Sequence, residues 1–464
     1  MVFSSLSFLS FFLPCVLALY FLSKKRAWRN LVLLAASLLF YSWGEPKALL
    51  LLLGVTLVSY LCALAVERAG SARPRLRKLC LIAAVSLILG NLFVFKYLNF
   101  TVRELSRLIG PLSGFRELAL PVGISFFTFQ ALSYVIDHYR GRIRVQRSFW
   151  TLLLYISLFP QLIAGPIVRY QTVEIELQDR QERLEDLWEG LLRFIEGLAK
   201  KVILANNIAL ICQAVYHGYT APLGTALWWL AALAYTLQIY FDFSGYSDMA
   251  IGLGRIFGFH FPENFDHPYT SLSVTEFWRR WHISLSSWFR DYVYIPLGGN
   301  RVPRARWLFN LLLVWMLTGF WHGAAWNFLL WGLYYGLLLI GEKLLWGARL
   351  ARAKKPLRWL YCFVLVTLGW VLFYHSDSRE LFRALGGMFS PAHTSLSALA
   401  SDPRLLLGLP FLLAGLVFMF PTGRLFARLR LPEWLRVAAH LLLLGASVLL
   451  IVSAGYNPFI YFRF

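Results

Sequence analysis

The feature that most restricts the fold of this chain is a series of apolar runs separated by short basic clusters. Runs such as 3–22, 79–98 and 437–453 carry few charged residues. A helix needs about 20 apolar residues to cross the hydrocarbon of a bilayer, because each residue adds about 1.5 Å. We therefore predict an all-α polytopic membrane protein with about eleven transmembrane helices, accompanied by broken or interfacial helices.

The strong positive charge of the chain follows the same pattern. The formal net charge of +21 comes from clusters that lie between apolar runs. These clusters are residues 24–26, 73–78, 140–147, 301–306, 349–358 and 424–430. Basic loops of this kind stay on the cytoplasmic side and contact anionic lipid. This distribution excludes a nucleic-acid partner and predicts membrane lipid as the surroundings of the protein.

Cysteine and metal chemistry are not indicated. The 5 cysteines lie in or beside apolar runs, without the paired spacing of a zinc site or a disulfide framework. We expect small apolar side chains there, and neither a bound metal nor a bound cofactor.

The apolar pattern becomes irregular in the middle of the chain. Residues 149–168 are interrupted by prolines, 174–189 are charged enough for a surface helix, and 274–289 have the spacing of one amphipathic interfacial helix. We expect a single membrane domain over 1–464. We divide it into N-terminal helices (1–148), a catalytic core (149–345) and C-terminal helices (346–464).

His322 is the main candidate for chemistry. It stands between apolar runs in the segment 318–326, where water cannot satisfy its ring. An imidazole also takes up and releases a proton near neutral pH. Gly319 and Gly323 flank it, and we expect them to leave room for a substrate; a histidine bonded only for packing is the alternative.

A second group of polar residues lies within apolar sequence. His282 is either a partner of His322 or an interfacial side chain. Asp242 and Asp248 either orient a histidine or pair with a buried Arg. Arg279 and Arg280 meet either the phosphates of a nucleotide-bearing donor or lipid headgroups.

Several motifs together resemble the membrane-bound O-acyltransferase family, in particular its bacterial branch that acetylates exopolysaccharides. They are Phe-Trp-Arg-Arg-Trp-His-Ile-Ser at 277–284, Asp-Tyr-Val-Tyr-Ile-Pro-Leu-Gly-Gly at 291–299, Gly-Phe-Trp-His-Gly at 319–323 and Phe-Asp-Phe-Ser-Gly-Tyr-Ser-Asp at 241–248. The first residues and the last eight residues match the same branch. The resemblance covers nearly the whole chain.

The resemblance implies a ring of helices around a central tunnel, with His322 as the essential histidine and His282 as the second tunnel residue. Further candidates for the donor tunnel are Trp278, Arg279, Arg280, Trp281, Trp321, Asp242, Asp248, Asp291 and Tyr294.

The activity that follows is O-acetylation of an exported polysaccharide, such as alginate or cellulose, at the bacterial inner membrane. We expect His322 to act as a general base, or to carry the acetyl group covalently, and His282 with nearby Trp or Tyr donors to orient the acyl group. Acetyl-CoA is the expected donor, and a periplasmic acetyltransferase of the secretion complex the expected partner. The alternative is a proton-coupled transporter that uses the same His and Asp residues, although the sequence shows no repeated halves.

Overall fold

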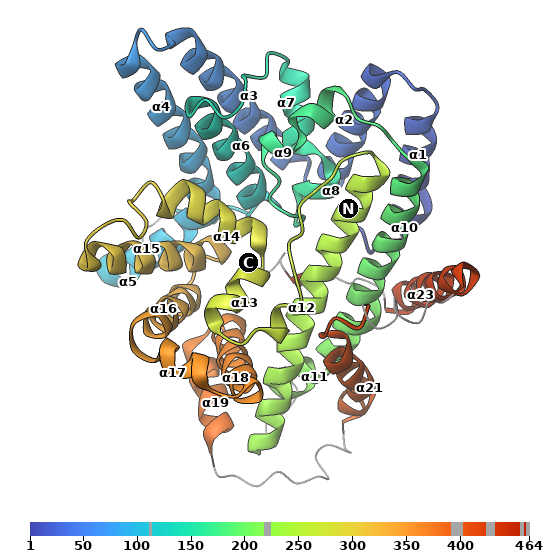
Figure 1. The fold of residues 1–464 in the computed structure, drawn as a ribbon, viewed down its shortest axis with the longest axis vertical. Helices are drawn as coiled ribbons and strands as arrows, with labels where there is room; N and C mark the ends of the chain where they lie inside the picture. Colours follow the sequence, from blue (N-terminus) through green and yellow to red (C-terminus); the bar gives the residue numbers. More distant parts are fainter. Residues whose placement is uncertain (111–113, 218–223, 391–401, 424–431, 455–458, 461–464) are drawn as a thin grey trace. The chain divides into compact units, whose positions relative to one another are not determined.

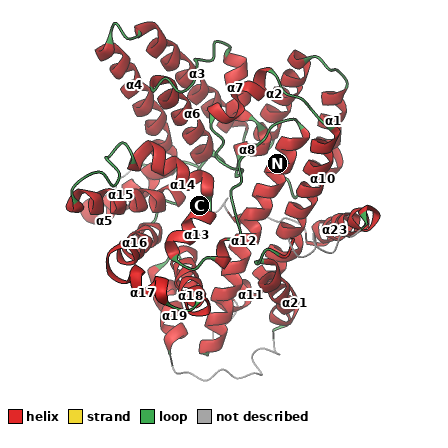
Figure 2. Ribbon diagram, in the orientation of Figure 1, coloured by secondary structure: helices red, strands yellow, loops and turns green. Residues whose placement is uncertain are grey.

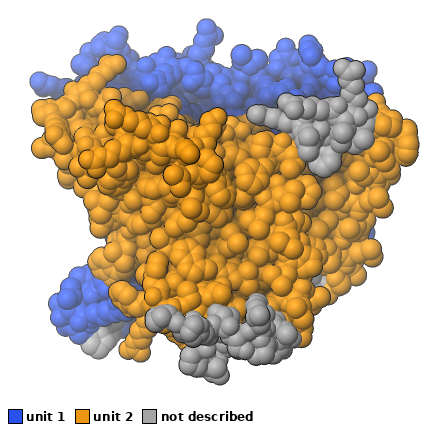
Figure 3. All heavy atoms as spheres, turned by 60° about the horizontal axis from the view of Figure 1, so that its bottom comes forward, with its two compact units in different colours: residues 1–194, 247–262 blue, residues 195–246, 263–464 orange. Residues whose placement is uncertain are grey.

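The structure is a computed structural model, and it describes residues 1–464 except 111–113, 218–223, 391–401, 424–431, 455–458 and 461–464. The described residues form helices joined by loops, with no strand among them (Figures 1 and 2). They divide into two compact units, which Figure 3 colours separately. Unit 1 comprises residues 1–194 and 247–262, and unit 2 comprises residues 195–246 and 263–464.

Unit 1 contains the first helices of the chain. They are η1 (Phe8–Phe12), α1 (Leu13–Phe21), α2 (Arg26–Ser42), α3 (Pro46–Ala69), α4 (Pro74–Leu92), η2 (Phe93–Tyr97), α5 (Leu98–Ile109), α6 (Ile124–Tyr139), α7 (Phe149–Ser157), α8 (Phe159–Leu162), α9 (Tyr170–Gln178) and most of α10 (Leu184–Ala199). The short helices α7 and α8 are separated at Leu158, Pro160 lies in the first turn of α8 and Pro166 follows its end, which confirms that this stretch is broken.

Unit 2 contains the remaining helices and the C-terminal half of the chain. They are η3 (Lys200–Ala205), α11 (Asn206–His217), most of α12 (Thr225–Ile256), η4 (Pro268–Thr270), α13 (Val274–Arg280), α14 (Ile283–Phe289), η5 (Arg290–Tyr294), α15 (Arg304–His322), α16 (Trp326–Gly341), η6 (Glu342–Trp346), α17 (Gly347–Arg352), α18 (Lys355–Tyr374), α19 (Ser378–Phe389), α21 (Pro403–Phe418) and α23 (Glu433–Ala454).

The membrane character of the chain is confirmed by the length and composition of its helices. Within the described residues, six helical segments are long and apolar enough to span a bilayer, and two further apolar helices are shorter. In the segments Pro74–Ile109 and Glu433–Ser453, only 17% of the apolar window is buried inside the protein. Apolar surface of that extent is stable in contact with lipid, so the chain is a multi-pass membrane protein.

The predicted surface helix at 174–189 is wrong. Helix α9 ends at Gln178, and α10 begins at Leu184. Between them, the side chain of Arg180 is fully buried, and its Nε donates to the carbonyl oxygen of Phe257 at 2.9 Å. Glu182 pairs with Arg26 at 2.6 Å and also with Arg29. A buried cation and its carboxylate need these fixed partners, so the chain leaves the helix to reach them.

Candidate active site

Helices α15 and α16 pack closely where the segment around His322 ends. A Cβ atom added to Gly319 would collide with the backbone of Phe328, and one added to Gly323 would collide with the ring of Phe328. The prediction that these glycines leave room for a substrate is therefore wrong. They allow two helices to approach each other, as small residues do in membrane proteins.

His322 is the last residue of α15 and is 5% exposed. Two aromatic rings stand edge-on to its imidazole, Trp331 of α16 at a centroid distance of 5.1 Å and Phe373 of α18 at 5.3 Å. Three helices therefore fix the ring from different sides. Since α15 ends at this residue, the irregular segment 323–325 begins directly beside the imidazole.

Trp331 brings an indole N–H to the surroundings of His322. Its side chain is fully buried, and no acceptor in the described part of the chain bonds its Nε1. The indole of Trp278 lies at 5.4 Å from the ring of Trp331, and its Nε1 likewise has no acceptor among the residues that the structure describes. Buried donors are nearly always bonded in proteins, so both N–H groups are available to an acceptor that the described residues do not supply.

The predicted helix 274–289 is broken at the second histidine. Helix α13 ends at Arg280 and α14 begins at Ile283, and His282 between them has φ 45° and ψ 54°. A left-handed conformation is unfavourable for a residue with a Cβ, and such strain persists only where the surroundings hold it. Two backbone bonds do so: Asp266 N donates to Arg280 O at 2.9 Å, and Ile283 N donates to Asn264 O at 3.0 Å.

Asn264 also holds the imidazole of His282. Its Oδ1 lies 3.1 Å from Nδ1 of His282, and it accepts from the Oγ and backbone N of Ser284 at 2.8 and 3.2 Å. A backbone N–H can only donate, so the atom of Asn264 at this position is the carbonyl oxygen. His282 must then donate through Nδ1–H, which leaves the lone pair of the ring on Nε2. Burial lowers the pKa of His282 to about 3, so the ring is neutral.

The indole of Trp321 contacts the rings of both histidines. Its centroid is 6.0 Å from the ring of His282 and 5.0 Å from the ring of His322. His282 also contacts Phe243 of α12 edge-on at 4.7 Å. Unit 2 thus brings together two buried imidazoles that contact the same aromatic side chain.

Glu342 fixes the helix that leads to His282. Its carboxylate accepts from Val274 N at 2.7 Å and from Thr275 N at 2.9 Å, at the first residues of α13. The hydroxyl of Tyr361 donates to the same carboxylate at 3.2 Å. A carboxylate is favourable at a helix N-terminus, where backbone N–H groups have no partner within the helix.

The two predicted acids are paired with cations. Asp242 forms an ion pair with Lys201, both side chains being almost fully buried, and it accepts from Ile460 N at 3.0 Å. Asp248 lies in unit 1, where it pairs with Arg193 at 2.8 Å. Both acids are ion-paired, Asp248 with an arginine as predicted and Asp242 with a lysine instead, and an orienting role towards a histidine stays a prediction.

The other predicted residues lie nearby or at the surface. Arg279 is exposed, and Arg280 pairs with Glu276 at 2.9 Å. Trp281 is buried against the ring of Trp370 at 4.7 Å. Two candidates have local partners.
These are Asp291, which pairs with Arg290 at 2.7 Å, and Tyr294, whose hydroxyl accepts from Trp307 at 3.0 Å.

Sequence reasoning did not single out Asn264, Trp331 or Glu342. Asn264 was one polar residue of a loop, and Trp331 one aromatic residue of an apolar run. Glu342 carried a weak signal, because a carboxylate at the end of an apolar run needs a partner.

Comparison with known proteins provides independent evidence on the family of this chain. A sequence model of the membrane-bound O-acyltransferase family matches residues 12–374. The chain is 41% identical to a probable alginate O-acetylase of Pseudomonas putida over the full length of both proteins. It is 33% identical to a peptidoglycan O-acetyltransferase of Helicobacter pylori, over all of this chain and 98% of that protein. A teichoic acid D-alanyltransferase of Bacillus subtilis is 32% identical over 47% of this chain and 58% of its own length.

Proposed function

The chain belongs to the membrane-bound O-acyltransferase family and is an O-acyltransferase; from this premise we propose that it moves an acetyl group from acetyl-CoA to an exported polysaccharide, with His322 and His282 as the reacting pair. The relatives acetylate alginate or peptidoglycan by name, which supports a carbohydrate polymer as the final acceptor. The observation that carries the proposal is the pair of buried imidazoles that both contact Trp321.

His322 is the general base in this proposal. The hydroxyl oxygen of the acceptor attacks the carbonyl carbon of the thioester while its proton passes to His322. The C–S bond then breaks, and the imidazolium returns that proton to the departing thiolate, so that an ester and a free thiol result. General-base assistance of this kind accelerates a reaction by about 10²–10⁴-fold. Burial of the ring at the end of α15 excludes the water that would hydrolyse the thioester.

His282 acts through its lone pair. Because Nδ1–H donates to Asn264, Nε2 can accept a hydrogen bond but cannot donate one to an oxyanion. The sequence led us to expect that His282 orients the acyl group. With Nε2 as an acceptor, we propose instead that His282 orients a group that carries a proton, such as the acceptor hydroxyl or an amide of the donor.

Trp331 supplies the donor that His282 lacks. In the proposal its open Nε1–H, on the ring that abuts His322, receives the carbonyl oxygen of the thioester as negative charge develops there. One well-placed donor of this kind contributes about 10²–10³-fold to the rate.

The donor is proposed to enter from the cytoplasmic side of a bacterial inner membrane. Arg279 is exposed two residues before the site segment Trp281–His282, where it can meet the phosphates of a nucleotide-bearing thioester. A periplasmic acetyltransferase then receives the acetyl group and decorates the polymer. Transport by a His and Asp relay has less support, because both acids are occupied by cations.

The test uses the purified protein in proteoliposomes with radiolabelled acetyl-CoA on one face, and the periplasmic acetyltransferase with a soluble oligosaccharide on the other. We expect His322→Ala to abolish labelled ester, and the matched control His260→Ala, an exposed histidine of unit 1, to retain it. Normal ester formation by His322→Ala would refute the assignment of this histidine. Flux of the label without ester formation would refute acyl transfer.

A further inference from the structure

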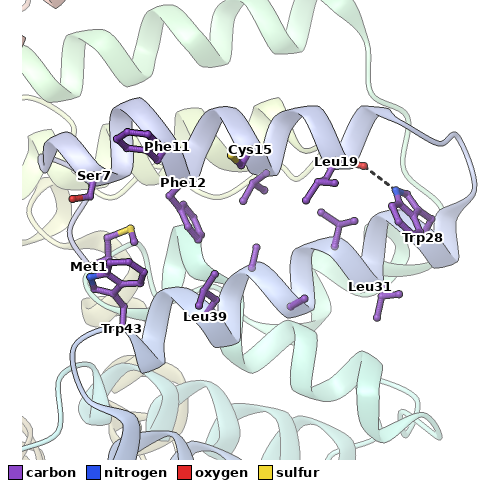
Figure 4. Close-up of a pocket in the computed structure, with 14 residues that line it drawn as sticks. Met1, Ser7, Phe11, Phe12, Cys15, Leu19, Trp28, Leu31, Leu39 and Trp43 are labelled. Atoms are coloured by element: carbon purple, nitrogen blue, oxygen red, sulfur yellow. Dashed lines mark hydrogen bonds between the residues drawn. The ribbon is translucent and has the colours of Figure 1, made fainter.

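Unit 1 has an apolar groove between its first two helices. It lies between the segment η1–α1 and helix α2, with a volume of about 640 Å³ (Figure 4). The side chains of Phe11, Phe12, Cys15 and Leu19 approach it from one helix, and those of Leu31 and Leu39 from the other. Ser7 carries the single aliphatic hydroxyl of its lining.

Both ends of the groove are bounded by aromatic residues. At one end the indole N–H of Trp28 donates to the carbonyl oxygen of Leu19 at 2.8 Å and so joins the two helices. At the other end lie Trp43 and Met1. Tryptophan favours the region of the lipid headgroups, so we place the Trp28 end of the groove near the headgroups.

The length of the groove is compatible with a lipid hydrocarbon chain. Along α2 it extends from Trp28 to about Leu39, which at 1.5 Å per residue is about 16 Å. One leaflet of hydrocarbon is about 15 Å deep, half of the bilayer core.

The charge at the Trp28 end selects the headgroup. Lys24 and Lys25 are exposed in the short connection between α1 and α2, and no carboxylate of the described chain pairs with them. The neighbouring Arg26 and Arg29 are already paired with Glu182. Two uncompensated cations at the mouth of a hydrocarbon groove are suited to a phosphate.

We propose that this groove is a binding site for an anionic glycerophospholipid, with one acyl chain along α2 and the phosphate at Lys24 and Lys25. The site is separate from the acyl-transfer chemistry, and its test does not depend on that activity. A bound chain would replace bilayer lipid along α1, which with η1 is shorter than a full membrane crossing.

The test uses phosphatidylglycerol that carries a diazirine in its acyl chain, incorporated at low fraction into phosphatidylcholine vesicles with the full chain. After irradiation, mass spectrometry maps the labelled peptides. We expect label concentrated on residues 11–19 and 31–39. Ala35→Trp, which fills the groove from an exposed position on α2, should remove that label, and Leu50→Trp on the exposed face of α3 should not.

The headgroup is tested with the double variant Lys24→Gln, Lys25→Gln. Each basic residue near the surface strengthens binding of an anionic lipid, so the two together should weaken phosphatidylglycerol labelling by on the order of 20-fold. A diazirine phosphatidylcholine should label the groove weakly and equally in both proteins. Label spread evenly over all exposed helices, or groove label that persists in Ala35→Trp, would show annular lipid only and overturn the site.

Discussion

The side-chain oxygen of Asn264 fixes the ring of His282, with Nδ1 of the imidazole 3.1 Å from Oδ1 of the amide. The same oxygen accepts the backbone N–H of Ser284, which identifies it as the acceptor of both bonds. One asparagine therefore decides which nitrogen of His282 carries the proton, as second-layer partners do at many catalytic histidines.

Replacing Asn264 with Asp should change the pH dependence of the reaction. The wild-type ring stays neutral because burial lowers the pKa of His282 to about 3. A carboxylate at hydrogen-bonding distance favours the imidazolium and raises that pKa. An opposite charge shifts a pKa by about 1–3 units, so we expect a new loss of kcat/KM below about pH 6 in Asn264→Asp, measured as a pH–rate profile.

The variant Asn264→Ala serves as the comparison for that profile. It removes the hydrogen bond that orients His282 without adding charge. We therefore expect lower kcat/KM at every pH, without the additional loss at low pH that is expected for Asn264→Asp. An unchanged profile in Asn264→Asp would mean that His282 takes no part in the reaction.

Replacing Trp331 with Phe should remove one donor and keep the ring. If Nε1–H receives the developing oxyanion, kcat should fall by about 10²–10³-fold with little change in KM. Initial rates at varied acetyl-CoA measure this. Trp229→Phe is the control, because its N–H donates to Met388 O at 2.9 Å outside the site. Equal rates for both variants would exclude Trp331 as the donor.

The sequence predicted the helical membrane architecture and the central histidine because both depend on local pattern. The length of an apolar run decides whether a helix inserts into the membrane. A histidine within such a run is costly unless it has a partner or a function. The break at His282 was not predictable in this way, since helical spacing continues through Trp281 and Leu285. It depends on backbone bonds to a loop that precedes α13 in the chain.

The prediction from Gly319 and Gly323 was also wrong. Space beside His322 was expected at Gly319 and Gly323, but residues of α16 occupy it. A glycine in a sequence shows that a side chain is excluded, and only the structure shows whether a ligand or another helix excludes it. The hydrogen bond between His282 and Asn264 could not be predicted either, because the two residues are eighteen positions apart in the chain.

Replacing Glu342 with Gln should loosen the start of α13. The amide nitrogen cannot accept, so one of the backbone N–H groups of Val274 and Thr275 loses its partner. An unsatisfied buried donor costs about 1–3 kcal/mol of the free energy of unfolding. Thermal unfolding in detergent measures the loss, with the exposed Glu380→Gln as control. We expect acyl transfer to fall as well, and a variant with unchanged stability and activity would contradict the anchoring role.

The stability of the protein should decrease between pH 6.5 and pH 5. Burial lowers the pKa of His282 to about 3, and burial together with the nearby His217 lowers that of His375 to about 4. In this window the unfolded chain takes up protons at both residues and the folded chain does not, so acid favours unfolding. The loss is about 1.4 kcal/mol per pH unit for each histidine.

The variant His375→Phe isolates one of the two contributions. Its free energy of unfolding should fall by about half as much as that of the wild type between pH 6.5 and pH 5, because one of the two proton-linked sites is gone. Chemical denaturation at both pH values provides the comparison. The same loss in variant and wild type would show that His375 does not titrate in this window.

Variants of the buried ion pair between Lys201 and Asp242 distinguish a structural role of Asp242 from a catalytic role. Removing one partner, as in Asp242→Asn, leaves an uncompensated buried charge and should cost about 3–5 kcal/mol of stability. The double variant Lys201→Met, Asp242→Leu removes both charges and should recover most of that loss, apart from the bond that Ile460 N donates to Asp242. If the pair only holds α12 and η3 together, the double variant should also recover acyl transfer. If Asp242 orients a histidine, the double variant should be stable and inactive, and thermal unfolding with transfer rates on the same preparations decides between the two.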